Sequence, residues 1–160
     1  MDIFLERAAA EDAAVLHLMQ KEAFQPLLDK YQDFETSPAN ETLERLLLRI
    51  EHPSECFLKI LEGNKLAGGV RVHWKENNEY WIGPLFIAPV FQGRGIAQKA
   101  MKQLEKGFPD AMSWELATIL EERGNCYLYE KLGYERTGKA EKLNEKTTLG
   151  YFKKEGAAKK

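Results

Sequence analysis

The stretch from Leu85 to Leu104 constrains the fold most, because it joins two patterns of different period across a short break. Its first residues, Leu85 to Ile87, suit a buried strand, and Pro89 cannot donate to a sheet ladder, so strand pairing should end near it. After Gly95 the apolar residues recur on one helical face, at Ile96, Ala100, Met101 and Leu104. The stretch therefore predicts a strand, a tight turn and a helix.

The turn between these elements has the features of an anion site. The amides from Gly93 to Ala97 should be among the first N–H groups of the helix, which have no carbonyl partner within it. With the helix dipole they suit a phosphate, and Gly93 and Gly95 carry no side chain that would hold a ligand away. Arg94 adds a positive charge. These residues favour a site where main-chain amides hold a diphosphate. The alternative is that the two glycines only permit a tight turn between strand and helix.

Two common phosphate loops are excluded by the letters. A dinucleotide fingerprint needs a third glycine where this chain has Gln98, and no G-x-x-x-x-G-K-[ST] occurs. The stretch instead contains Q-x-x-G-x-A at Gln92, Gly95 and Ala97, preceded by L-F-I-A-P. This pattern resembles the acetyl-CoA loop of the GNAT superfamily of N-acetyltransferases.

Length and composition favour one domain, expected over residues 1–153. A chain of 160 residues with 44 % hydrophobic content can bury one substantial core. The formal net charge of −2 argues against nucleic-acid binding. Cys56 and Cys126 are far apart, without zinc-site spacing, and fit core thiols in a reducing compartment. With no leader-like or membrane-spanning segment, the sequence predicts a soluble cytoplasmic protein, with a disordered basic tail over 154–160.

The remaining elements follow from periodicity and turn residues. A helix with Val15, Leu18, Met19 and Glu22 on one face should end at Pro26, and Ser37-Pro38 should open a second helix. Gly63-Asn64 and Asn77-Asn78 suit hairpin turns, and Gly83-Pro84 should bend or bulge its strand. The expected strands are Ile3–Glu6, 56–61, 65–74, 79–87, 112–120, 134–138 and 147–152, with helices over 11–24, 37–50, 96–104 and 124–132.

A second motif supports the resemblance. Residues Asn125 to Tyr134 read N-C-Y-L-Y-E-K-L-G-Y, which is similar to the C-terminal GNAT signature N-x-x-x-Y-E-K-x-G-[FY]. The order of predicted elements also follows the family. The resemblance implies an α/β (α+β) fold: a mixed, mostly antiparallel sheet of about seven strands flanked by about four helices, with strands four and five splayed.

The same resemblance implies how acetyl-CoA is held as acyl donor. Its diphosphate would bind the helix start, its pantetheine arm would pair with strand four, and an asparagine and a tyrosine on the later helix would contact the arm and protonate the departing thiolate. The residues matched to these roles are Gln92, Gly93, Arg94, Gly95, Ile96 and Ala97 for the diphosphate, Leu85, Phe86 and Ile87 for the arm, and Asn125 and Tyr129 on the helix.

The role of Tyr129 has two interpretations. A phenol has a pKa of about 10, somewhat above a thiol, so it can donate a proton late in bond breaking without ionising at rest. Alternatively, Tyr129 and Tyr134 stand at positions that often touch where a helix ends in glycine, here Gly133. We favour the acid role, with packing against Tyr134 as the alternative.

The general base and the acceptor site are less clearly marked. Where some family members place a glutamate on strand four, this chain has Trp81, leaving Glu79 as the candidate base, with Glu115 and His73 as other possibilities. The segment Leu27 to Thr36 is predicted to be a loop or an irregular helix. Its acidic and aromatic residues would receive a cationic amine or serve only as a solvated connector; the candidate acceptor residues are Tyr31, Asp33, Glu35 and Trp81.

The sequence thus predicts an acetyl-CoA-dependent N-acetyltransferase acting on a small-molecule or peptide amine. No metal, nucleic acid or membrane is expected to take part. A CoA-binding module without turnover and a transferase for another acyl group are the alternatives. An exposed edge strand near the C-terminus would permit a homodimer.

Overall fold

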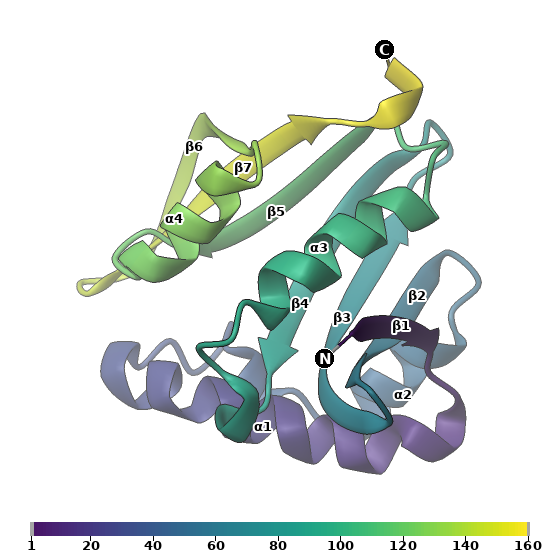
Figure 1. The fold of residues 1–160 in the computed structure, drawn as a ribbon. Helices are drawn as coiled ribbons and strands as arrows, with labels where there is room; N and C mark the ends of the chain where they lie inside the picture. Colours follow the sequence, from purple (N-terminus) through teal and green to yellow (C-terminus); the bar gives the residue numbers. More distant parts are fainter. Residues whose placement is uncertain (1, 160) are drawn as a thin grey trace.

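A computed structural model describes residues 2–159, in which seven strands form one sheet and four α-helices cover it (Figure 1). The sheet order is β1-β2-β3-β4-β5-β7-β6, and all neighbours are antiparallel except β4 and β5. The predicted fold class is confirmed. The elements are β1 (Ile3–Arg7), α1 (Ala13–Tyr31), α2 (Leu43–Glu51), β2 (Glu55–Glu62), β3 (Lys65–Trp74), β4 (Glu79–Ile87), α3 (Ile96–Gly107), β5 (Ser113–Ile119), α4 (Arg123–Lys131), β6 (Glu135–Asn144) and β7 (Thr147–Glu155), with short 3-10 turns η1 (Ala10–Asp12), η2 (Pro38–Asn40), η3 (Pro89–Phe91) and η4 (Ala157–Lys159).

The helices cover both faces of the sheet. In Figure 1, α3 and α4 lie in front of the strands, and α1 and α2 lie behind them. The apolar face predicted for α3 is buried against the sheet, at Ile96, Ala100, Met101 and Leu104. A separate cluster behind the sheet joins α1 and α2 to Phe57 and Phe86. The sheet is therefore packed on both sides, as layered α/β domains require.

Helix α1 ends later than predicted, and the residues that it buries were not those that share the predicted face. It passes through Pro26 and ends at Tyr31, where Gln32 adopts a left-handed conformation and its N–H donates to the Leu28 carbonyl at 2.7 Å. Proline therefore did not stop the helix. The face that Val15 and Leu18 share points largely to solvent, since these residues are 47 % and 56 % exposed. The buried positions include Leu16 and Gln20. Burial of the polar Gln20 is possible because its amide donates a hydrogen bond to the Pro38 carbonyl in η2.

The second helix starts later than Ser37-Pro38 predicted. The Ser37 hydroxyl accepts a hydrogen bond from the Ala39 N–H, but it caps only η2. Helix α2 begins after Thr42, whose hydroxyl accepts from the Arg45 N–H at 3.2 Å. Both hydroxyls are N-caps of the expected chemistry, and only the second opens a helix long enough to pack on the sheet.

The C-terminal end is more ordered than predicted. Strand β7 extends to Glu155, and the Gly156 and Ala158 N–H groups donate to the carbonyls of Met112 and Ala111 at 2.9 and 3.1 Å. Disorder from residue 154 is therefore wrong for 154–159, because main-chain hydrogen bonds to the segment before β5 hold this stretch. Lys160, the last residue of the predicted tail, lies outside the described residues. Within residues 2–159, no helix has the length and apolar character needed to cross a membrane.

Candidate active site

The sheet opens between β4 and β5. The two strands pair at Glu79–Ser113, Tyr80–Trp114 and Trp81–Glu115 only, and then diverge (Figure 1). The bulge predicted at Gly83-Pro84 is present, as a register shift where these two residues oppose Arg71 alone. The splay predicted between strands four and five is therefore confirmed, and it leaves main-chain edges of β4 and β5 without strand partners.

A cavity of about 1070 Å³ occupies this opening. Its walls come from the diverging halves of β4 and β5, the η3–α3 turn, α4, the α1–η2 segment and α2. The cavity has two ends of different construction. One is formed mainly by main chain at the start of α3, and the other mainly by charged side chains near α2.

The main-chain end has a run of amides without protein partners. The Gln92 N–H donates to the Pro89 carbonyl at 3.3 Å, and the Lys99 N–H donates to Gly95 at 3.2 Å. Between them, no hydrogen bond within residues 2–159 uses the amides from Gly93 to Gln98. The two glycines have φ of +80° and +74°, and a Cβ on either would meet nothing within 4 Å. The turn leaves open space in front of donors that suit an anion.

Two predicted diphosphate ligands are partly engaged elsewhere. The Gln92 side chain donates to the Ile87 carbonyl at 2.9 Å, so it stabilises the turn from β4. Arg94 donates to Glu62 at 2.9 Å, lies over the Phe91 ring, and is not among the cavity-lining residues. The charge of Arg94 is therefore partly neutralised by Glu62 of β2. All predicted donor-site residues except Arg94 line the cavity: Leu85, Phe86, Ile87, Gln92, Gly93, Gly95, Ile96, Ala97, Asn125 and Tyr129.

Tyr129 packs against other aromatic rings and also borders the cavity. Its ring packs edge-on against Tyr134 at 6.2 Å and near Phe152 at 6.3 Å, while the residue also lines the cavity. Burial raises the pKa of Tyr129 to about 12, so the phenol stays protonated at neutral pH. No hydrogen bond involving its hydroxyl is present in the described part of the chain. The helix ends as predicted at Gly133, where the Tyr134 N–H donates to the Tyr129 carbonyl at 3.0 Å.

The predicted acceptor residues separate into two groups. Asp33, Glu35 and Trp81 line the cavity. Tyr31 does not, because it is buried as the last residue of α1, with its hydroxyl donating to Glu122 at 2.8 Å. The expected loop is helical up to this residue, and that places the ring inside the protein.

None of the candidate bases reaches the cavity. Glu79 is the first residue of β4, in the paired half of the strand and roughly 26 Å from Ile87 at 3.3 Å per residue. Glu115 also lies in the paired half and faces Lys153 at 3.8 Å. His73 is on β3, where burial and the charge of Arg49 lower its pKa. All three lie outside the cavity lining, so the geometry does not support Glu79 as the base.

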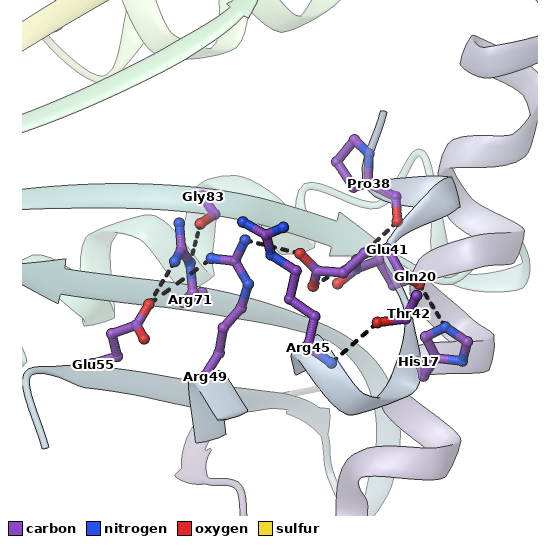
Figure 2. A network of polar contacts seen from close by, with 10 residues as sticks. All are labelled: His17, Gln20, Pro38, Glu41, Thr42, Arg45, Arg49, Glu55, Arg71 and Gly83. Carbon is purple, nitrogen blue, oxygen red and sulfur yellow. Dashed lines mark hydrogen bonds and ion pairs between the residues drawn. The ribbon is translucent and has the colours of Figure 1, made fainter. Parts of the chain in front are cut away.

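A charged network that was not predicted from the sequence lies at the α2 end of the cavity (Figure 2). Arg49 pairs with Glu41 at 2.9 Å, and Arg71 pairs with Glu55 while donating to the Gly83 carbonyl at 2.6 Å. Behind Glu41, the Gln20 amide donates to the Pro38 carbonyl at 2.9 Å. The only local signal was Arg45 and Arg49 at helical spacing, since the other members come from α1, η2, β2, β3 and β4.

Comparisons with known proteins agree with this architecture. The model of the acetyltransferase (GNAT) family matches residues 16–134. A mostly antiparallel seven-stranded sheet with β4 and β5 splayed is the fold of that class. The chain belongs to the GNAT acetyltransferase family, which confirms the resemblance found in its two motifs.

One curated relative and two solved structures show the range of similarity. The uncharacterized protein YrkN of Bacillus subtilis is 27 % identical over 139 residues, which cover 82 % of this chain and 72 % of YrkN. Spermidine N-acetyltransferase from Vibrio cholerae, solved with CoA and spermine, has a TM-score of 0.79 at 15 % identity, over 98 % of this chain and 97 % of the other. A Salmonella typhimurium acetyltransferase that modifies the N-terminal serine of ribosomal protein L7/L12 has a TM-score of 0.76 at 18 % identity, over 96 % and 94 %.

Proposed function

We propose that this protein transfers the acetyl group of acetyl-CoA to a primary amine of a small molecule or peptide, by direct attack within a ternary complex. The proposal rests on one observation: the free amides and the opening in the sheet lie at the same place. The run of unbonded amides from Gly93 to Gln98 lies at the opening where β4 and β5 separate. A cofactor whose diphosphate binds there can extend a peptide-like arm along the edge of β4 that has no strand partner.

The donor would be held mostly by main chain. Its diphosphate would accept from the amides at the start of α3, where the helix dipole adds favourable charge. The pantetheine arm would run beside Leu85 to Ile87, whose edge facing β5 has no strand partner. Asn125 on α4 lines the same cavity and supplies an amide side chain for the arm.

In the reaction, the amine first loses a proton to solvent water, and its neutral nitrogen then attacks the thioester carbonyl carbon. The carbon–sulfur bond breaks, and the nitrogen gives its second proton to solvent as the amide forms. Tyr129 would donate a proton to the departing thiolate and be reprotonated from solvent, and its raised pKa keeps that proton in place at neutral pH. The protein needs no nucleophilic side chain, because holding amine and thioester together supplies much of the acceleration.

Formation of CoA thiol from acetyl-CoA, with mass analysis of the acetylated amine, tests the proposal. The amines should include polyamines, amino acids and short peptides, and the donors should include longer acyl-CoAs. Thiol release that depends on an amine supports transfer. A protein that shows no thermal shift with acetyl-CoA and no thiol release with any amine would contradict it.

A CoA-binding protein without turnover is the second candidate. The observation that favours it is the position of Glu79, Glu115 and His73 outside the cavity. Saturable CoA binding without turnover on any amine would establish it. Amine-dependent turnover that is lost in Tyr129→Phe, with CoA binding retained, would exclude it.

A further inference from the structure

We infer that the acceptor amine carries a carboxylate, which Arg45, Arg49 and Arg71 recognise at the α2 end of the cavity. The inference rests on the proposed function and specifies its acceptor. It opposes the cationic acceptor that the acidic segment before η2 suggests from sequence. The three guanidinium groups belong to residues that all line the cavity.

The three arginines converge from two elements. Arg45 and Arg49 are four residues apart on α2, so they share a face of the helix, and Arg71 comes from β3. Figure 2 shows both α2 side chains extending toward Glu41 and the β4 strand that carries Gly83. The Arg71 guanidinium is fixed by the Gly83 carbonyl and by Glu55, which lies outside the cavity lining. These two partners fix the orientation of the guanidinium, and Arg71 itself lines the cavity.

The network has more positive groups than negative ones. Glu41 and Glu55 pair with Arg49 and Arg71, whose side chains are only 18 % and 12 % exposed. Arg45 is exposed, and within residues 2–159 its guanidinium has neither a hydrogen bond nor an ion pair, so it is free to reach a ligand. The Arg49 Nε, by contrast, is buried without a partner. A bound anion would satisfy the Arg49 Nε and reduce repulsion between the three like charges.

A carboxylate suits these donors in shape as well as in charge. A guanidinium presents N–H groups in a planar fork that can bind both carboxylate oxygens. Four acidic residues also line the cavity, and two of them have partners. Glu41 is paired with Arg49, and the Glu122 carboxylate accepts from Tyr31 and faces Lys30 at 3.5 Å. The other two, Asp33 and Glu35, come from the segment before η2, whereas the arginines come from α2 and β3.

Matched amines test the inference directly. With acetyl-CoA saturating, γ-aminobutyrate should give a kcat/KM at least about tenfold above that of n-butylamine, which has a methyl group in place of the carboxylate. Spermidine should be a poor acceptor. A preference for n-butylamine or spermidine would overturn the inference while leaving acetyl transfer intact. A preference for phosphoethanolamine over every amine that carries a carboxylate would show that the arginines recognise a phosphate and would overturn the inference.

Variants locate the effect. Arg45→Gln should lower kcat/KM for γ-aminobutyrate about tenfold, leave n-butylamine within about twofold, and leave the KM of acetyl-CoA unchanged. Arg45→Lys should recover part of the loss. Arg136→Gln is the matched control, because Arg136 lies on the exposed strand β6, outside the cavity lining. Equal losses for both amines in Arg45→Gln would count against carboxylate recognition.

Direct binding separates failure of the inference from failure of the proposed function. If no amine is acetylated, γ-aminobutyrate is titrated by calorimetry into the CoA-loaded protein and into its Arg45→Gln variant. Binding that the variant loses supports the carboxylate site even though acetyl transfer has failed. No binding to the wild-type protein overturns the carboxylate site.

Discussion

The two ends of the cavity are built differently, and the ligands proposed for them would be recognised by different means. The donor end presents main-chain N–H groups from one continuous turn, Gly93 to Gln98. The acceptor end presents long side chains, Arg45, Arg49 and Arg71, placed by α2 and β3 and held by carboxylates from elsewhere. A main-chain site tolerates change in most side chains, whereas a site of charged side chains changes its ligand with one substitution. Changes at the donor end should therefore affect every acceptor equally, and changes at the acceptor end should be selective.

The largest effect should come from Tyr129→Phe, which removes the proton donor and keeps the packing of the ring. We expect kcat to fall about 100-fold or more with every acceptor, while the affinity for CoA changes little. Steady-state kinetics and CoA titration measure the two quantities. Tyr127→Phe is the control, because Tyr127 is 68 % exposed on the same helix. A wild-type kcat in Tyr129→Phe would leave this residue with a packing role only.

Gly95→Asn should produce the next largest effect. Asparagine tolerates the left-handed conformation of this position, φ +74°, but places a side chain beside the free amides. We expect the KM of acetyl-CoA to rise about tenfold or more, since a charge-assisted hydrogen bond is worth about 1.5–3 kcal/mol. Acetyl-pantetheine, which has no diphosphate, should be used equally well by both proteins. Gly138→Asn on β6, where φ is +88°, is a remote control. An unchanged KM of acetyl-CoA would show that the diphosphate does not bind at the start of α3.

The ionisation of Tyr129 gives a smaller, spectroscopic test. Burial raises its pKa to about 12, so the protonated form, which is the acid, is lost only as the pH rises through that value. Between about pH 9 and 11, where a free tyrosine titrates, tyrosinate absorbance should be the same in the wild type and in Tyr129→Phe. An additional tyrosine titrating near pH 10 in the wild type alone would show that Tyr129 is solvated.

The smallest effect should come from Glu79→Gln, because Glu79 belongs to neither end of the cavity. We expect kcat/KM to stay within about twofold for all acceptors, since surface substitutions away from a site change little. Its carboxylate accepts one hydrogen bond, from the neighbouring Asn77 amide. A loss of 100-fold in kcat would restore Glu79 as a base and show that the active cavity reaches the paired half of β4.

Local sequence predicted the backbone around the start of α3 well and the placement of the charged side chains near α2 poorly. The start of α3, its buried face, the Gly83-Pro84 bulge and the end of α4 at Gly133 all depend on residues close together in the chain. The length of α1 does not, because its last turn is held by tertiary contacts of Tyr31, whose carbonyl accepts from Asn144 at 2.8 Å. The same contacts remove Tyr31 from the acceptor site.

By itself the sequence determined the order of the elements, the family and the place of the unbonded amides, because periodicity and glycine positions act through the backbone over a few residues. Only the tertiary structure decided which charges face the cavity. Arg45, Arg49 and Arg71 meet because α2 packs behind the sheet beside β2, while Glu79 is carried away because β4 and β5 pair at that end. Side chains meet according to packing between distant segments, which no short stretch of the sequence encodes.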